Sequence, residues 1–292
     1  MKNYGAKLFK EKWRLGKLFL LAKTDKYSAP QLAKIFQCEK KTIQGVLNNN
    51  AIKLKNLGLF KKKYFCNENF FVNLTAISAY WAGFIAADGC LWSKNGRGKS
   101  LFIGLKQSDI KHLEKFRKAI KSNAKISYIK SNNSVHIGLW SEDKIFDSLT
   151  KLGIEQNKSL RIKKVKITHR FMSHFIRGVF DGDGYFGGKK VTHIQFQIGG
   201  YKPLLEQIQE VLVKKCKVKR VKIYPLSYGT GTMASRLQYT GSQIFRILDF
   251  LYKNSIEETR LNRKYKKYLI LKKKFLVLYR KNTILYKNPK KL

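Results

Sequence analysis

Two short segments of this chain each end in an aspartate followed by a glycine. Ala79 to Gly89 reads AYWAGFIAADG, and Phe175 to Gly184 reads FIRGVFDGDG. Aligned on their glycines, the segments match at four positions: Gly83 with Gly178, Ala87 with Gly182, Asp88 with Asp183, and Gly89 with Gly184. Mg²⁺ is often bound in proteins by one or two carboxylates together with substrate phosphate. A pair of aspartates held together could therefore support metal-assisted hydrolysis of a phosphodiester.

The elements that must position these aspartates are two apolar helices. In each segment the matched small residues stand four apart, on one face of a helix. Glycine inside a helix costs roughly 1 kcal/mol relative to alanine, so its presence at the same step in both segments predicts close approach of the two backbones. An Asp-Gly after an apolar run is also typical of a simple turn. The repetition of the whole pattern favours the paired helices.

WAGFIAADG and IRGVFDGDG resemble the paired motifs of single-chain LAGLIDADG homing endonucleases. The resemblance implies an α+β fold of two pseudo-symmetric αββαββα halves, which form a DNA-binding saddle with the motif helices at their interface. It assigns metal binding to Asp88 and Asp183, and the neighbouring carbonyls of Ala87 and Gly182 could complete the ligand shell. The first motif departs from the pattern at Ala86, where the second keeps Asp181. From the resemblance we expect Mg²⁺ as cofactor, Mn²⁺ as its substitute, and Ca²⁺ as a cation that binds without supporting cleavage.

The family also places polar and basic side chains around the metal-bound waters. Our candidates for this catalytic role are Gln107 and Lys158 in the first half and Lys264, or its neighbour Arg263, in the second. An ordinary phosphate clamp is the alternative role for the two lysines. The second-half position that matches Gln107 falls near Gly199, which has no side chain, and this predicts unequal support for the two strand cuts.

The composition points to a polyanionic partner. The chain has 61 Lys plus Arg against 18 Asp plus Glu among 292 residues, a formal net charge of +43. Such a field favours nucleic acid, and a Lys- and Asn-rich composition alone would not explain the scarcity of acids. The apolar stretches are too short to span a membrane. The sequence has no secretory signal, no Walker-type loop, and four cysteines without zinc or disulfide spacing.

The segment of about residues 15–54 has a different sequence pattern, which predicts two short helices joined by a turn at Gln37 to Glu39. This pattern resembles a helix-turn-helix, whose second helix enters the major groove. A small helical bundle with exposed lysines is the alternative. The predicted DNA contacts of the second helix are Lys40, Lys41, Thr42 and Gln44.

The rest of the chain repeats the order helix, hairpin, helix, hairpin, helix. Its strands alternate polar and apolar residues, so one face packs on helices and the other can meet DNA. The predicted DNA contacts in the first half are Lys94, Arg97, Lys99, Lys106, Lys130 and His136. Those in the second half are Lys189, Lys190, Gln195, Gln197, Lys222, Tyr224, Arg236 and Gln238.

These observations predict a helix-turn-helix domain at 1–60, a basic linker at 61–77, a first LAGLIDADG half at 78–165, and a second half with a C-terminal basic helix at 166–292. The expected function is that of a monomeric, site-specific endonuclease that makes double-strand breaks in DNA. The initial Met and the missing splicing nucleophile favour a free-standing or intron-encoded protein, located in a bacterial or phage cytoplasm or in an organelle. Two alternatives stay open: an intron RNA maturase on the same fold, and a helix-turn-helix regulator that binds DNA without cutting it.

Overall fold

The computed structural model describes residues 11–24, 27–52, 54, 64–94, 97–140, 142–156, 164–188, 193–226 and 234–287, without the side chains of 97 and 279–287. The chain divides into two compact units, Met1–Lys63 and Tyr64–Leu292. Each unit has an apolar core of its own.

The N-terminal unit contains three described helices, α2 (Lys12–Lys23), α3 (Ala29–Ile35) and α4 (Lys40–Asn49). Their buried face includes Leu18, Leu32 and Ile43. A tight turn joins α3 to α4, where the amide of Cys38 donates to the carbonyl of Ala33 at 2.9 Å. This arrangement agrees with the two short helices and the turn that the sequence predicts.

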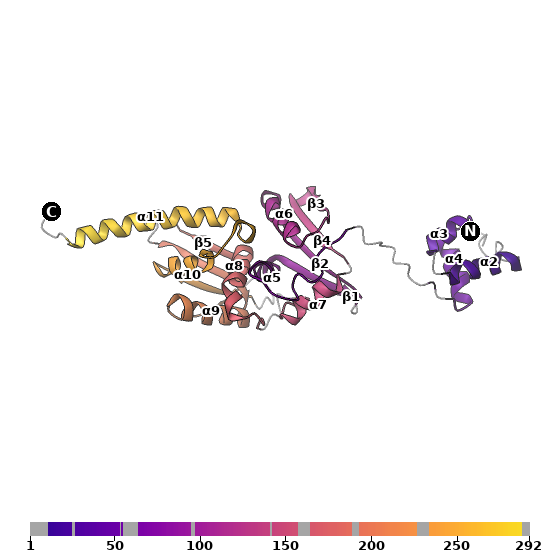
Figure 1. Cartoon of the computed structure of the whole chain (residues 1–292), viewed down its shortest axis with the longest axis horizontal. Helices are drawn as coiled ribbons and strands as arrows, with labels where there is room; N and C mark the ends of the chain where they lie inside the picture. Colours follow the sequence, from indigo (N-terminus) through magenta and orange to yellow (C-terminus); the bar gives the residue numbers. More distant parts are fainter. Residues whose placement is uncertain are drawn as a thin grey trace. The chain divides into compact units, whose positions relative to one another are not determined.

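The larger unit consists of two halves with the same order of elements (Figure 1). The first half runs through α5 (Ala76–Asp88), β1 (Gly89–Lys94), β2 (Arg97–Lys106), η1 (Gln107–Asp109), α6 (Ile110–Ala119), β3 (Ile126–Ile129), η2 (Lys130–Asn132), β4 (Ser134–Leu139) and α7 (Asp143–Lys151). The second half runs through η4 (His169–Phe171), α8 (Met172–Asp183), β5 (Gly184–Gly187), β6 (Gln195–Tyr201), α9 (Lys202–Cys216), β7 (Tyr224–Pro225), β8 (Ala234–Thr240), α10 (Gln243–Tyr252), η6 (Glu257–Thr259) and α11 (Asn262–Lys287).

Each half folds into a four-stranded antiparallel sheet, with strand orders β1-β2-β4-β3 and β5-β6-β8-β7. The correspondence between the two orders confirms the predicted pseudo-symmetric α+β fold. Along β4, Val135, Ile137 and Leu139 are buried, while the residues between them are partly exposed. Each sheet thus has a buried face and a second face, here called the open face, whose side chains alternate with the buried ones.

Helices α5 and α8 lie side by side between the two halves (Figure 1) and pack along their length. Helix α5 begins at an N-cap, where Oγ1 of Thr75 accepts the amide of Ser78 at 3.1 Å. It is buried on almost every side, because the first half covers one flank and α8 covers the other. The helix pair is the centre of the unit's core.

The predicted linker at 61–77 is wrong from Tyr64 onward. The side chain of Phe71 is buried, the amide of Phe65 donates to Asn123 at 2.8 Å, and the thiol of Cys66 donates to Glu142 at 3.1 Å. Aromatic side chains scattered through a basic segment give it enough apolar surface to pack on the first half. Residues 61–63 lie outside the described part of the chain.

Helix α11 is a long basic helix, as the sequence predicts, and its C-terminal part extends beyond the sheet of the second half (Figure 1). In the described residues, we find no helix with the length and apolar character needed to cross a membrane.

Candidate functional site

Two glycines allow α5 and α8 to touch at their backbones. A Cβ atom built on Gly83 would overlap the carbonyl oxygen of Phe175, and a Cβ atom built on Gly178 would overlap the carbonyl oxygen of Tyr80. The contacts are reciprocal, since each glycine stands three residues after the carbonyl that the other one faces. The structure therefore confirms the predicted helix packing at Gly83 and Gly178.

The same packing brings the two candidate metal ligands together. Asp88 and Asp183 are the last residues of α5 and α8, and both are exposed. A Cβ atom built on Gly182 would lie 3.1 Å from Oδ2 of Asp88 and would overlap Cβ of Ala87. The carboxylate of Asp88 thus lies beside the residue that precedes Asp183. Both aspartates act electrostatically on the same ammonium group, that of Lys264.

Lys264 lies beneath this pair and caps the C-terminal end of α8. Its ammonium group donates to the carbonyl oxygens of Phe180 at 2.5 Å, Asp181 at 2.9 Å and Gly184 at 2.5 Å. Burial lowers the pKa of Lys264 to about 8, although the nearby carboxylate of Asp181 opposes the shift. All three donors of the ammonium are engaged, so the geometry favours positioning of the helix end over direct contact with a reacting group.

Asp181 is the centre of a buried hydrogen-bond network. Its carboxylate accepts from the hydroxyl of Tyr80 at 2.8 Å, the hydroxyl of Tyr252 at 3.1 Å, and the amide of Leu261 at 2.8 Å. Burial raises the pKa of Asp181, while these donors and Lys264 favour its ionised form. The acid that distinguishes the second motif from the first therefore fixes the start of α11 and is not exposed beside Asp88.

The network continues into the first half through His112. Nε2 of His112 lies 3.0 Å from the hydroxyl of Tyr80. Since that hydroxyl donates to Asp181, His112 must donate through Nε2. Burial and nearby cations lower the pKa of His112 to about 3. A neutral histidine thus links α6 to the helix pair.

Sequence reasoning missed Arg177, which is fully buried in α8. Its guanidinium donates to the carbonyl of Leu251 at 2.7 Å, and to the carbonyl and hydroxyl of Thr259 at 2.7 and 3.0 Å. It also contacts Nδ1 of His174 at 2.9 Å. The signal was present, because an arginine inside the apolar run FIRGVF must find buried acceptors.

The donor set at the ends of α5 and α8 fits a hard divalent cation. Two carboxylates lie near the C-terminal ends of two helices, where each macrodipole adds about half a negative charge. A bound divalent cation would offset this negative charge, in addition to the ammonium of Lys264. In the described part of the chain, no cluster of three or more His, Cys, Asp or Glu side chains could hold a metal. The pair alone matches the one or two carboxylates that suffice for Mg²⁺ when phosphate and water supply the other ligands.

Several predicted DNA contacts lie on the open faces of the sheets. In the second sheet Gln197 stands opposite Gln238 and donates to Oε1 of Gln195 at 2.9 Å. Lys222 is exposed, and its ammonium lies 5.5 Å from the ring centroid of Tyr224. In the first half the exposed or partly exposed candidates are Lys94, Lys106, Gln107, Lys130 and His136.

The structure corrects the predicted DNA contact of Lys99. Its ammonium pairs with Asp147 of α7 at 2.5 Å and lies over the ring of Phe146, at 5.6 Å from the centroid. The residue has the same strand phase as the buried Leu101 and Ile103. It therefore packs on the helix-covered face and does not point from the open face.

The predicted correspondence between Gln107 and Gly199 is also wrong. The registers pair Gly89 with Ile103 and Gly184 with Ile198. Gly199 therefore corresponds to Gly104, and three residues further on Gln107 corresponds to Lys202. The expectation of unequal strand cuts loses this basis.

The remaining predictions are distributed around this site. Arg263 is exposed and forms an ion pair with Asp109 at 3.0 Å. The strand position of Arg97 is described, but its side chain is not. Lys158, Lys189 and Lys190 lie outside the described residues, and their roles stay predictions.

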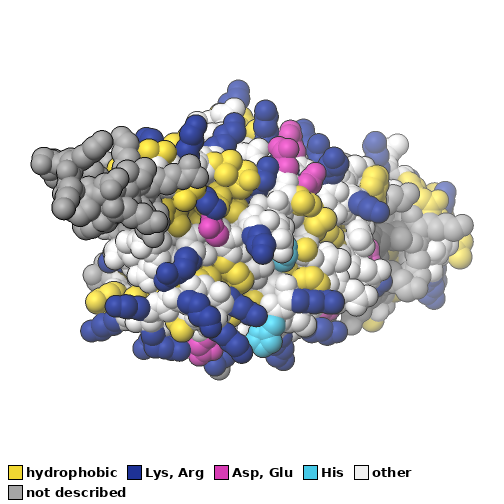
Figure 2. Space-filling model, turned by 60° about the vertical axis from the view of Figure 1, so that its left-hand side comes forward, with side chains coloured by type: hydrophobic (Ala, Val, Ile, Leu, Met, Phe, Trp, Pro, Cys, Tyr) yellow, Lys and Arg dark blue, Asp and Glu magenta, His cyan; other side chains and the backbone are white. Residues whose placement is uncertain are grey.

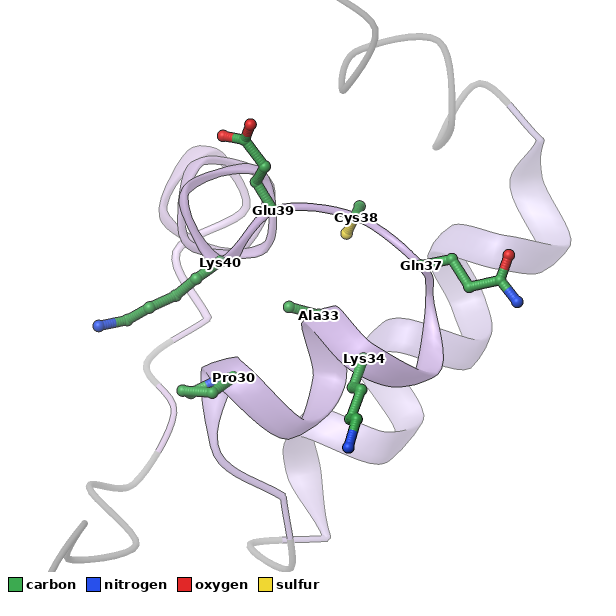
Figure 3. A pocket seen from close by; sticks show the side chains of 7 residues that line it. All are labelled: Pro30, Ala33, Lys34, Gln37, Cys38, Glu39 and Lys40. Atoms are coloured by element: carbon green, nitrogen blue, oxygen red, sulfur yellow. The ribbon is translucent and has the colours of Figure 1, made fainter.

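In the N-terminal unit, α4 presents an exposed basic and polar surface. Lys40, Lys41 and Gln44 are exposed, and Thr42 is partly buried. Figure 3 shows Lys34 of α3 and Lys40 of α4 extending away from the two helices, while Ala33 lies between them. The geometry is compatible with the predicted DNA contacts of this helix.

Basic side chains also dominate the surface. Figure 2 shows Lys and Arg spread over the visible face of the molecule, with few Asp or Glu among them. This distribution follows from the formal net charge of +43, and it suits contact with an extended polyanion.

No family model matches this chain. No curated protein matches it either. Among solved structures, it is similar to the meganuclease I-SmaMI bound to uncleavable DNA, with 17% identity over 72% of this chain and 91% of that one, and a TM-score of 0.48. It is also similar to the LAGLIDADG meganuclease I-CpaMI bound to uncleaved DNA (15% identity, 74% and 95% coverage, TM-score 0.48) and to the LAGLIDADG homing endonuclease I-LtrWI bound to target DNA (12% identity, 68% and 91% coverage, TM-score 0.45). The last two structures belong by their own descriptions to the family that the two motifs resemble.

Proposed function

We propose that this protein is a site-specific DNA endonuclease of the LAGLIDADG type, which hydrolyses one phosphodiester in each strand. The observation that carries the proposal is the convergence of Asp88 and Asp183 at the ends of two helices in backbone contact. Few structural needs place two exposed carboxylates at the adjoining ends of a helix pair on so basic a chain. Binding of a cation between them at a DNA backbone accounts for both features.

A divalent cation bound by Asp88 and Asp183 would activate water and stabilise negative charge on the phosphate. The chain itself supplies the position of these carboxylates. Gly83 and Gly178 set the separation of α5 and α8, and Lys264 fixes the end of α8 through its carbonyls. The carbonyls of Ala87 and Gly182 are available as further ligands in this proposal. Mg²⁺ would support cleavage, Mn²⁺ would replace it, and Ca²⁺ would support binding only.

DNA binding in this proposal uses both units. The open faces of the two sheets contact the central target, and Lys40, Lys41, Thr42 and Gln44 of α4 act as a helix-turn-helix that extends the footprint. Basic residues in both units would make binding strongly dependent on salt. Because both halves reside in one chain, a monomer suffices.

The test is cleavage of a randomised duplex library with Mg²⁺, with Mn²⁺ and with Ca²⁺. Asp88→Asn and Asp183→Asn remove the ligand charge at nearly constant volume, and Asp143→Asn, at the exposed start of α7, is the matched control. Cuts that require Mg²⁺ and both motif aspartates support the proposal. Sequence-specific binding without cleavage would favour the regulator, and retention of a structured intron RNA in preference to duplex DNA would favour the maturase.

A further inference from the structure

The strand registers place one residue row across the open face of each sheet. In the first sheet, Gly89 pairs with Ile103 and Gly104 pairs with His136. Extending the first register by one residue places Asp88 opposite Gly104. The first row is therefore Asp88, Gly104, His136.

The second sheet repeats this row with one difference. Gly184 pairs with Ile198, and Gly199 pairs with Arg236. A Cβ atom built on Gly199 would lie 3.9 Å from the carbonyl oxygen of Asp183, so the two residues are neighbours. The second row is Asp183, Gly199, Arg236. A histidine and an arginine thus occupy equivalent positions.

Both central glycines leave open space on the sheet. A Cβ atom built on Gly104 would meet no atom within 4 Å, and one built on Gly199 would meet only that backbone oxygen. By contrast, the position above Gly138 is filled, because its Cβ would lie 3.0 Å from both Phe102 and Trp140. Neighbouring strands are about 4.8 Å apart, so roughly 10 Å separates the ends of each row. A phosphate with its bound waters fits such a gap.

The basic ends of the rows are incompletely satisfied within the described part of the chain. Nδ1 of His136 and Nε of Arg236 are buried and make no hydrogen bond there. The two residues are only partly buried as a whole. Those two atoms are closed to solvent, so a ligand in the gap would contact the other ring nitrogen of His136 or the outer guanidinium nitrogens of Arg236.

We propose that each row is a binding site for one backbone phosphate. The metal-binding aspartate lies at one end of the row, the glycine leaves space in the middle, and His136 or Arg236 lies at the other end. This inference rests on the proposed endonuclease function and assigns a positioning role to the two basic residues. Arg236 offers a permanently charged, forked donor, whereas His136 offers a single ring nitrogen. The two sites therefore bind their phosphates with different strength, and one strand is cut faster than the other.

The first experiment labels the two strands of the cleaved target with different fluorophores and measures each cutting rate. We expect Arg236→Ala to slow mainly one strand and His136→Ala mainly the other, each by roughly 10-fold or more. The exchange His136→Arg with Arg236→His should invert the ratio of the two rates. Lys214→Ala, on the exposed side of α9, is the matched control. Equal effects on both strands, or none, would overturn the inference while leaving the endonuclease intact.

The second experiment needs no cleavage. Single methylphosphonates, which remove the charge of one phosphate, are scanned through the duplex that the protein binds in Ca²⁺. We expect one substitution to weaken wild-type binding roughly 10-fold but to have no effect on Arg236→Ala, and another to behave likewise with His136→Ala. Gly104→Val should weaken binding without lowering Tm, since its side chain fills open space. If no methylphosphonate loses its effect on binding in either variant, the two phosphate sites do not exist, whatever the result of the cleavage assay.

Discussion

The separation of α5 and α8 is the property on which the candidate site depends, and alanine at Gly83 or Gly178 tests it. Alanine favours a helix by about 1 kcal/mol over glycine. Against this gain, overpacking costs roughly 1–3 kcal/mol even where side chains can move aside. Here the added methyl meets a carbonyl oxygen of the opposite helix, which cannot move without its backbone. We therefore expect each substitution to lower the free energy of unfolding by about 2 kcal/mol net.

The assay is thermal and urea unfolding of the full chain. A loss of this size lowers Tm by about 4–8 °C for a unit of this length. Because both methyls push the same two helices apart, the double variant should lose less than the sum of the single losses. Gly45→Ala in α4 is the matched control, since its Cβ would meet nothing within 4 Å. Single variants as stable as the wild type would refute the backbone contact.

Three further predictions concern the surroundings of the metal ligands. Lys264 loses its proton as the pH rises through about 8, so the rate of cleavage should fall above that pH because α8 loses its cap. In the unfolded chain Lys264 keeps its proton up to about pH 10.5, so between these pH values unfolding takes up a proton and the free energy of unfolding should increase. Cleavage rates and urea midpoints measured across this pH range check the two effects. Gly182→Ala places a methyl against Ala87 and 3.1 Å from Oδ2 of Asp88, so cutting should fall at least 10-fold in a single-turnover assay while Ca²⁺-supported DNA binding persists. Arg177→Met leaves buried carbonyls without donors and should cost about 3 kcal/mol in urea unfolding, and a smaller loss than 1 kcal/mol would contradict the network.

The helix pair and its aspartates could be predicted because their causes are local. Glycine and alanine at a spacing of four mark a helix face that allows close approach, and the repeated Asp-Gly marks where each helix ends. The two sheets could be predicted for the same reason, from strands that alternate polar and apolar residues and from the turns between them. Each of these patterns is complete within a dozen residues of the sequence.

The errors concern properties that depend on strand register or on backbone acceptors. The sequence alone does not fix the face on which Lys99 lies, because a shift of one residue exchanges the two faces of a strand. The counterpart of Gly199 follows only from the pairings of Gly89 with Ile103 and of Gly184 with Ile198, which make it Gly104 and not Gln107. The three carbonyls that bind Lys264 have no sequence signature, so its buried position at the end of α8 could not be predicted.

The two motif helices are alike in packing but differ in one buried polar pair. Ala86 corresponds to Asp181, and Tyr80 corresponds to Phe175, so the hydroxyl that donates to Asp181 comes from the other helix. The buried pair therefore takes its tyrosine from α5 and its aspartate from α8, and it needs two different motif helices in one unit. A pair of identical second motifs would place Phe where Tyr80 stands and leave the buried carboxylate with one donor fewer.

A double-mutant cycle measures this dependence in the full chain. Tyr80→Phe removes a hydrogen bond to a buried carboxylate, which costs about 1.5–3 kcal/mol. In an Asp181→Ala background, which gives the second helix the residue of the first, the same substitution should cost less, because no carboxylate remains to be satisfied and only the hydrogen bond from Nε2 of His112 is lost. Urea unfolding of the four proteins gives the coupling energy. An equal cost of Tyr80→Phe in both backgrounds would mean that the hydroxyl stabilises the core through His112 alone, and that the acid in the second motif does not require a tyrosine in the first.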